Sequence, residues 1–298
     1  MRRGDLEGAW RVTDLLESER RLAESAGAFR WSPNHLLWNG EPLEGRSVVV
    51  YCNHGLGDTL QFIRFVPHLL RLADWVTALV QPPLVPVLRG VPGFGEVLNG
   101  WSVGAPLDPS AVQIEVMELA YALRVSQGTL SPMIPYLPHS HIRRKSRLRF
   151  PPLERGLKHV GISWEASGWD PTRSIPMENW EVLGSVRNVK YYSLQQGGNL
   201  IGHAPFAMEP WSESTRAILD VAHALLRLDL LITVDGMLAH LAGALGRPVW
   251  LLLKHEADWR WMSDRTDSPW YPTMRLFRQK SPGNWGDVLE EVAGALME

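Results

Sequence analysis

The clearest hydrophobic pattern of the chain lies between residues 230 and 253. Leu230–Val234 is a continuous apolar run, which is typical of a parallel strand that is buried on both faces. Apolar residues then recur at helical spacing until Gly246, and glycine commonly ends helices. Val249–Leu253 is a second apolar run. The pattern predicts a strand, a helix and a second strand, which is the repeating unit of parallel α/β folds.

The turn between the first strand and the helix carries the polar groups of this stretch. Asp235 stands where a helix N-cap is expected, and Gly236 follows it. In such a unit the helix N-terminus lies at the carboxyl edge of the sheet, where free N–H groups favour an anion such as a diphosphate. The alternative gives Asp235 only a capping role and makes His240 a hydrogen-bonded, half-buried residue. This stretch alone leaves the two interpretations equally supported.

The same alternation recurs along the rest of the chain. It predicts further strands over 48–52, 75–80, 96–98, 112–117, 159–164, 189–195 and 273–278. It predicts helices over 59–72, 81–91, 177–186, 214–226 and 285–296, and one or two amphipathic helices within 1–28. Strands that alternate with helices indicate parallel sheets, so we expect an α/β protein with two halves.

The length and the proline distribution predict where the halves meet. A chain of 298 residues is long for one hydrophobic core. Residues 132–152 contain five prolines and a basic run, a composition typical of a solvated linker. We therefore predict an N-terminal helical segment, a first domain, a second domain and a closing helix, over 1–30, 31–150, 151–282 and 283–298.

Composition excludes several classes of protein. Lys and Arg number 30 against 32 for Asp and Glu, and this lack of a basic surplus argues against nucleic acid as a partner. The single cysteine, Cys52, excludes a disulfide framework and a cysteine-based zinc site. No apolar run approaches the roughly 20 residues of a membrane span, and the first 30 residues lack the apolar core of a signal peptide. We expect a cytoplasmic protein.

Candidate acid and base residues follow two strands of the first half. The turn after 48–52 contains Gly55 and Gly57, which allow a sharp bend and a close approach to a ligand. Asp58 begins the next helix, either as a first-turn acid or as a base that faces a substrate. Glu115 and Glu118 lie near the end of another strand, as acceptor contacts or as solvated acids.

Two loops of the second half add candidate binding residues. The loop over 165–176 follows a strand end, so it should reach the same edge as Asp235. Arg173 within it is a phosphate ligand by type, although a surface arginine is the simpler interpretation. Residues 254–272 are dense in aromatic, arginine and acidic side chains. That composition is typical of a sugar-binding or lid surface, and equally of an internally paired structural loop.

Several segments together resemble a known family. HGLGDTLQFIRFVP (54–67), WEASGWDPTRSIP (164–176), YSLQ (192–195), TVDGMLAHLAGALGRPVWLLL (233–253) and DWRWMSDRTDSPWYPTMRLFRQ (258–279) resemble the glycosyltransferase domain that often follows tetratricopeptide repeats in bacteria. That domain is similar to the lipopolysaccharide heptosyltransferases, and the resemblance covers roughly residues 30–298. It implies a GT-B fold, in which two Rossmann-like domains face a central cleft. The acceptor then binds the N-terminal domain and a nucleotide-sugar donor binds the C-terminal one, without metal or cofactor.

The resemblance also implies roles for single residues. Asp58 falls at the general base, which takes the acceptor proton in an inverting transfer. Gly55 and Gly57 fall in a phosphate or acceptor loop. The implied donor-binding residues are Arg173, Asp235, Gly236, Met237, His240, Trp164, Gln195 and Lys254.

The chain departs from the family pattern on the acceptor side. Asn53 and His54 stand where an acid and a glutamine usually precede GLGD. EVMELA, over 115–120, replaces a segment that usually contains an S-L-P type motif.

These observations support one function and leave one alternative. The first is a metal-independent inverting glycosyltransferase that acts on a glycan, lipid-linked or protein acceptor. The alternative is a non-catalytic protein that kept the fold and binds a nucleotide-sugar or a partner. A dinucleotide-dependent oxidoreductase is disfavoured, because neither half has GxGxxG after its first strand or an acid about 20 residues further on.

Overall fold

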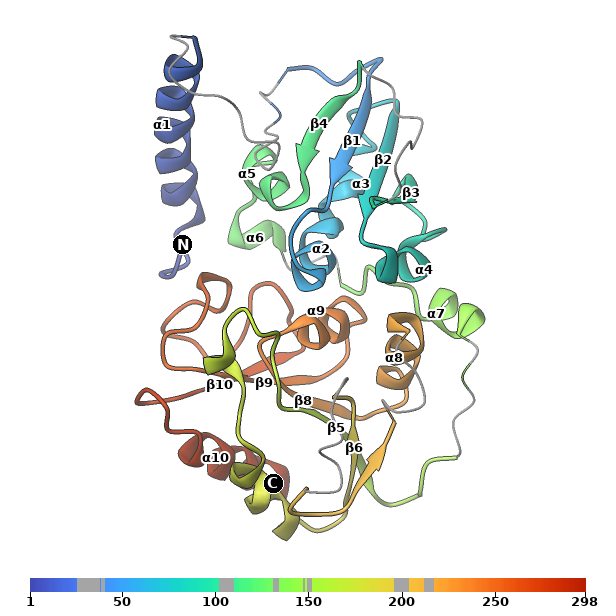
Figure 1. Cartoon of the computed structure of the whole chain (residues 1–298), viewed down its shortest axis with the longest axis vertical. Coiled ribbons are helices and arrows are strands. Elements are labelled where there is room, and N and C mark those ends of the chain that lie inside the picture. The colour runs from blue at the N-terminus through green and yellow to red at the C-terminus, as the bar shows by residue number, and fades with distance from the viewer. Residues whose placement is uncertain are drawn as a thin grey trace. The chain divides into compact units, whose positions relative to one another are not determined.

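The computed structural model describes residues 1–25, 38, 41–101, 110–130, 134–146, 148, 152–195, 204–211 and 217–298. Its contacts divide the chain into a first unit, Met1–Met133, and a second unit, Ile134–Glu298. Each unit is built around a parallel sheet with helices beside it (Figure 1). The predicted α/β class is confirmed.

The first unit contains a sheet in the order β3-β2-β1-β4. All three pairings are parallel. Its strands are β1 (Ser47–Tyr51), β2 (Trp75–Val80), β3 (Glu96–Asn99) and β4 (Val112–Glu115). The connecting helices are α2 (Leu56–Phe62), η1 (Ile63–Phe65), α3 (Val66–Leu69), η2 (Pro82–Leu84), α4 (Val85–Leu88), η3 (Val116–Glu118), α5 (Leu119–Ala122) and α6 (Gln127–Leu130). The chain extends the sheet to one side of β1 and then returns to place β4 on the other side.

The single helix predicted over 59–72 is divided in the structure. It begins earlier, at Leu56, and continues as α2, η1 and α3. Pro67 has no N–H to donate to the carbonyl four residues before it, so a regular ladder does not pass through this point.

The amphipathic helix predicted within 1–28 is α1 (Leu6–Ser25). It is attached to the first unit through Trp10, whose indole N–H donates to the Val125 carbonyl at 2.7 Å. Asp14 pairs with Arg124, with 2.6 Å between Oδ1 and Nη2. The other face of α1 exposes a row of apolar side chains, namely Val12, Leu15, Leu16 and Leu22. Most of the connector over 27–45 lies outside the described residues.

The second unit contains a parallel sheet in the order β10-β9-β8-β5-β6-β7. Numbered along the chain, this is the 3-2-1-4-5-6 order of a Rossmann sheet. The strands are β5 (Lys158–Ser163), β6 (Val189–Ser193), β7 (Met208–Pro210), β8 (Leu230–Val234), β9 (Val249–Leu253) and β10 (Met274–Arg278). The edge strand β7 was not predicted, because it is short and polar and ends in proline.

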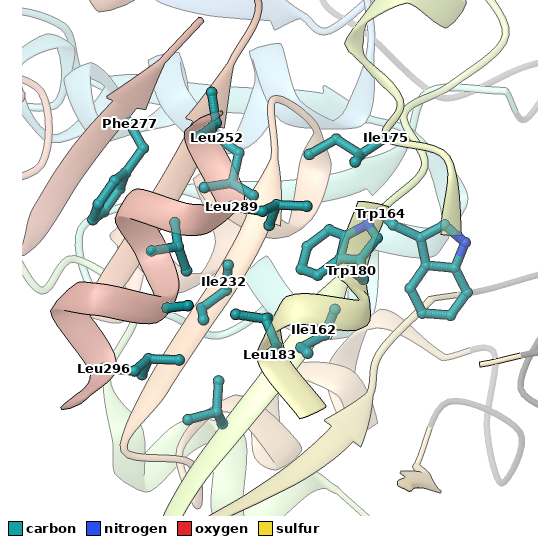
Figure 2. Packing of buried hydrophobic residues seen from close by; sticks show 14 of the residues in the cluster. Ile162, Trp164, Ile175, Trp180, Leu183, Ile232, Leu252, Phe277, Leu289 and Leu296 are labelled. Carbon is teal, nitrogen blue, oxygen red and sulfur yellow. The ribbon is translucent and has the colours of Figure 1, made fainter. Parts of the chain in front are cut away.

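Helices cover both faces of this sheet (Figure 1). The helices α8 (Ile218–Leu225) and α9 (Met237–Ala244) lie on one face. The 3₁₀ segment η6 (Met177–Ser185) and α10 (Gly286–Met297) lie on the other. Figure 2 shows the core under η6 and α10, which is packed with Trp164, Trp180, Leu183, Ile232 and Leu289.

The linker predicted over 132–152 is partly a packed helix instead. The helix α7 (His139–Lys145) buries His141 and Ile142 and packs against α8. Ser146 Oγ donates to Asp220 Oδ1 at 2.7 Å, which attaches the end of α7 to α8. These contacts group residues from 134 onward with the second unit, whereas the sequence pattern placed residues up to 150 in the first.

The packing of α9 leaves no room for a side chain at position 243. A Cβ atom there would lie 2.4 Å from Tyr271 Cδ1, and Tyr271 is completely buried. We expect Gly243→Ala to lower the free energy of unfolding by about 1–3 kcal/mol, because the ring or the helix must move. Urea denaturation measures this change.

The matched control is Gly294→Ala in α10, where no atom of the described part of the chain lies within 4 Å of an added Cβ. Alanine favours a helix interior over glycine, so this variant should gain up to about 1 kcal/mol. Equal stabilisation by both substitutions would contradict the packing described for α9.

Candidate functional site

The candidate donor site lies at the carboxyl edge of the second unit's sheet. Strand order reverses between β5 and β8, which pair in parallel. The chain leaves β5 and β8 toward opposite faces of such a sheet, so backbone at this edge is left uncovered. Ligands of open α/β sheets bind at this reversal. The loop that contains Arg173 and the turn that contains Asp235 both begin here.

The turn after β8 presents open backbone. Gly236, rather than Asp235, is the N-cap of α9, and it has an extended conformation with no side-chain cap. The expected capping role of Asp235 is therefore wrong. Among the described residues, an added Cβ on Gly236 would have only the Val234 carbonyl near it, at 4.0 Å. Gly236 and Met237, both half-buried, thus begin a helix whose N-terminus has no side-chain cap.

Arg173 joins the two loops of this edge. Its Nη1 donates to the Asp235 carbonyl oxygen at 3.1 Å, and its Nη2 donates to Ser167 Oγ at 3.2 Å. Its Nε donates to the Asp170 carbonyl at 3.3 Å. The surface-arginine interpretation is wrong, because the side chain is largely buried and bridges the loops after β5 and β8.

Lys254 connects a third loop, the one after β9, to the same place. Its Nζ lies 2.7 Å from Asp170 Oδ2 and 3.2 Å from Thr172 Oγ1. The Lys254 ammonium and the Thr172 hydroxyl hold the pKa of the Asp170 carboxyl below its ordinary value. Two cationic side chains, Arg173 and Lys254, are thereby positioned by the protein itself.

Asp235 is a buried acid, with 8% of its surface exposed. Burial raises the pKa of its carboxyl, while the indole N–H of Trp261 and the charges of Arg173 and Arg260 oppose that rise. The nearby carboxylate of Asp258 adds to the rise. Asp235 is therefore a carboxyl group held at the ligand edge at an electrostatic cost, as functional acids often are.

Two predicted donor-binding residues have structural contacts here. The amide oxygen of Gln195 accepts from Ser163 Oγ at 2.9 Å, Trp164 N at 3.2 Å and Glu165 N at 3.0 Å, so it fixes the start of the loop after β5. The Trp164 ring is buried in the core beside Trp180 (Figure 2).

His240 belongs to an aromatic cluster behind the Asp235 turn. Its Nδ1 lies 3.0 Å from the Tyr271 hydroxyl, and its ring stacks on Trp261 at 5.4 Å. The rings of Trp261, Trp270 and Tyr271 are all fully buried. The aromatic side chains of residues 254–272 are therefore mostly packed inside the unit, where they support the turn.

Sequence reasoning missed Asp170 and Arg260 as members of this site. Asp170 holds Lys254, and Arg260 lies close enough to favour the charged form of Asp235. The segment DPTR carried a signal for Asp170, because Asp before Pro commonly caps a short helix, and Asp170 accepts from Thr172 N at 3.1 Å. No local signal distinguished Arg260 from the other charged residues of its loop.

The acceptor-side candidates lie in the first unit, on the turn after β1. Asp58 is in the first turn of α2, and its Oδ2 accepts from the Gly55 backbone N–H at 3.0 Å. Gly55 is exposed and Gly57 is half-buried. The first-turn role considered for Asp58 is therefore present, and it fixes the carboxylate beside this turn.

The two departures from the family pattern meet at this edge. Glu115 ends β4 and is paired in register with Tyr51 of β1. Its carboxylate Oε2 lies 3.8 Å from His54 Nε2. Glu115 is 1% exposed, so it is not the solvated acid considered above. Glu118 belongs to η3.

Within the described residues, no three side chains of His, Cys, Asp or Glu form a group that could hold a metal ion. Over the same residues, no helix is both long and apolar enough to cross a membrane.

Because the carboxyl of Asp235 is buried, we predict that the free energy of unfolding depends on pH. A pKa raised by folding adds stability that is fully present below the unfolded value of about 4 and is lost as pH rises through the folded value. We expect the free energy of unfolding to fall more between pH 4 and pH 8 in the wild type than in Asp235→Asn. Urea denaturation across this range measures both proteins, and parallel curves would contradict the burial effect.

No protein-family model matches the chain. Protein FlbA of Caulobacter vibrioides is 24% identical over 291 residues, which cover 88% of this chain and 48% of FlbA. The chain thus spans about half the length of this curated relative.

Solved structures show the fold. A glycosyl transferase family 9 protein from Veillonella parvula matches with a TM-score of 0.58 and 14% identity, covering 87% of this chain and 99% of that one. The E. coli heptosyltransferase WaaC, solved with ADP-2-deoxy-2-fluoro heptose, matches with a TM-score of 0.52 and 13% identity, covering 84% and 99%. The chain therefore has the GT-B fold of the family 9 glycosyltransferases and the heptosyltransferases, as the resemblance implied.

Proposed function

We propose that this protein is a glycosyltransferase that moves a sugar from a nucleotide-sugar donor to an acceptor hydroxyl. The observation that carries the proposal is the N-terminus of α9 at Gly236, which has no side-chain cap and begins at the reversal of strand order, together with the loops that hold Arg173 and Lys254. A helix N-terminus with two fixed cations suits a diphosphate. The likeness in fold to WaaC, which was solved with an ADP-heptose analogue, supports a nucleotide-sugar as the ligand.

On the donor side, the protein must stabilise the diphosphate leaving group. As the bond between the sugar and the diphosphate breaks, negative charge develops on the diphosphate. The first N–H groups of α9 and the cations of Arg173 and Lys254 stabilise that charge, so the transfer needs no metal. Asp235, held beside them, accepts hydrogen bonds from hydroxyl groups of the donor.

The acceptor half assigns Asp58 as the general base. It takes the proton of the acceptor hydroxyl while that oxygen bonds to the anomeric carbon and the diphosphate leaves with the electron pair. A single displacement inverts the anomeric configuration. The acceptor is a glycan, a lipid-linked sugar or a protein hydroxyl, and the proposal keeps the cytoplasmic setting expected from the sequence.

A second candidate is a protein that binds the donor without transferring the sugar. The departures at Asn53, His54 and Glu115 favour it, because all of them lie at the same edge of the first unit's sheet as Asp58. Donor binding is expected of both candidates. Only the glycosyltransferase should also turn over the donor, at a rate that depends on Asp58.

Donor binding should raise the thermal stability of the wild type. We expect one class among ADP-, GDP-, UDP-, TDP- and CMP-sugars to stabilise by about 2.7 kcal/mol at 100 times its Kd. Thermal shift measures the effect. Arg173→Gln should lose most of it, because the variant removes a cation from the diphosphate.

The matched control is Arg275→Gln, an exposed arginine on β10 that stacks on Trp250 and Phe277. Its shift should equal that of the wild type. A full shift in Arg173→Gln would refute the assigned role of Arg173, and no shift with any nucleotide-sugar would refute the proposed function.

Turnover should depend on Asp58. With ADP-heptose as donor and water as acceptor, we expect Asp58→Asn to lower the rate of ADP release by about 10²–10⁴-fold. Thermal shift by the donor should remain, and EDTA should leave the wild-type rate unchanged. Asp74→Asn is the control, because Asp74 likewise accepts from a glycine N–H, that of Gly45 at 3.0 Å. Donor binding without any ADP release from the wild type would favour the non-catalytic candidate.

A further inference from the structure

Two departures from the family pattern, His54 and Glu115, are far apart in the sequence but lie next to each other in the first unit. His54 lies on the turn after β1, and Glu115 is the last residue of the neighbouring strand β4. The separation of 3.8 Å between His54 Nε2 and Glu115 Oε2 is that of a charge contact rather than a hydrogen bond. The pair occupies the same sheet edge as Asp58.

Glu115 is a buried carboxyl with unmet hydrogen-bonding capacity. Its Oε2 accepts from Met117 N at 2.7 Å, but its Oε1 has no hydrogen-bond partner in the part of the chain that the structure describes. Burial raises its pKa to about 7, although the Met117 N–H favours the ionised form. Glu118 adds to the rise through its negative charge. The thiol of Cys52 stays neutral beside it, because burial and Glu115 raise the pKa of that thiol.

The turn that carries His54 is held from both sides. Gln81 Nε2 donates to the His54 carbonyl at 2.7 Å, and Gln81 Oε1 accepts from Thr59 Oγ1 at 3.0 Å. Asp58 Oδ2 accepts from the N–H of Gly55, the residue after His54. The imidazole of His54 is 45% exposed, so it reaches solvent while Glu115 does not. A base, an imidazole and a buried carboxyl are thus fixed around one turn.

We propose that His54 is a second acid–base residue of the transfer and that Glu115 is its positioning residue. This inference rests on the proposed function. The acceptor O–H bond breaks, the oxygen bonds to the anomeric carbon, and the diphosphate leaves with its electron pair. The proton passes to Asp58 and from there to Nδ1 of His54, whose Nε2–H faces Glu115. The imidazolium then releases the proton to solvent.

The chemistry of the groups gives the relay its direction. An imidazole holds a proton near neutral pH more firmly than an ordinary carboxylate does. An ionised carboxyl next to it stabilises the imidazolium, as in other histidine–carboxylate pairs. In return, the positive charge of His54 offsets the cost of ionising the buried Glu115. With Glu115 ionised, the pair changes from a net charge of −1 to zero when it takes the proton from Asp58. Asp58 is then again an ionised base.

The first test needs neither donor nor acceptor. Two-dimensional NMR of the ¹⁵N-labelled full chain records the ring resonances of His54, which are assigned by their loss in His54→Gln. We expect the isosteric Glu115→Gln to move the ring resonances of His54, because it replaces the carboxylate oxygen that lies 3.8 Å from Nε2. His54 ring resonances unchanged by Glu115→Gln overturn the pair, whatever the chain catalyses.

The second test measures ADP release from ADP-heptose, with water as acceptor, between pH 5.5 and pH 9. We expect His54→Gln and Glu115→Gln to lower kcat at pH 7 at least tenfold, to move the acid limb of the profile, and to leave KM unchanged. His68→Gln, on α3 of the same unit, should match the wild type.

Three results would overturn the relay. A wild-type rate and profile in His54→Gln excludes His54 from proton transfer. An active Asp58→Asn beside an inactive His54→Gln places the base on His54 itself. A wild type that binds the donor and shows the Glu115-dependent His54 resonances but releases no ADP refutes the transfer, and the relay with it, while the contact of His54 with Glu115 stands.

Discussion

The second unit depends on one topological constraint, the reversal of strand order between β5 and β8. A parallel sheet with both faces covered needs its crossovers on both sides, and the chain changes side at this point. The two strands are held rigidly by the cores on either face. Their carboxyl ends are left without a crossing segment, so the loops that follow them supply the N-terminus of α9, a buried acid and Arg173, and the loop after β9 adds Lys254. The position of the candidate donor site thus follows from the order of the strands.

The polar groups of that edge are held by one another before any ligand is present. Arg173 ties the loop after β5 to the turn after β8, and Lys254 ties the loop after β9 to Asp170. Behind them, His240, Trp261 and Tyr271 fill the space under α9. A site built in this way does not have to order its loops when an anion arrives, which lowers the entropic cost of binding. Asp235 lowers the stability of the fold, because it is kept at this edge although burial disfavours its charged form.

The sequence pattern predicted the strands well and single side-chain roles less well. Continuous apolar runs placed nine strands within two residues of their observed bounds, because a strand buried on both faces admits few polar residues. The pattern missed β7, whose residues are too polar, and the break at Pro67. Arg173 and Asp235 were found because they follow strand ends. The contact of His54 with Glu115 was not, since it depends on the register of β1 against β4, which neither segment encodes alone.

The uneven burial of tryptophan has a spectroscopic consequence. Trp164, Trp180, Trp261 and Trp270 of the second unit are fully buried, whereas the first unit buries Trp10 and leaves Trp75 and Trp101 55% and 71% exposed. Trp169 of the second unit is also exposed, at 87%. An indole ring emits at shorter wavelength in an apolar core than in water, so a red shift on unfolding arises mainly from rings that leave such a core. Intrinsic fluorescence of this protein is therefore weighted toward loss of structure in the second unit. Far-ultraviolet circular dichroism instead measures the loss of helix in both units. Comparing the unfolding curves from fluorescence and circular dichroism therefore reports whether the units unfold together.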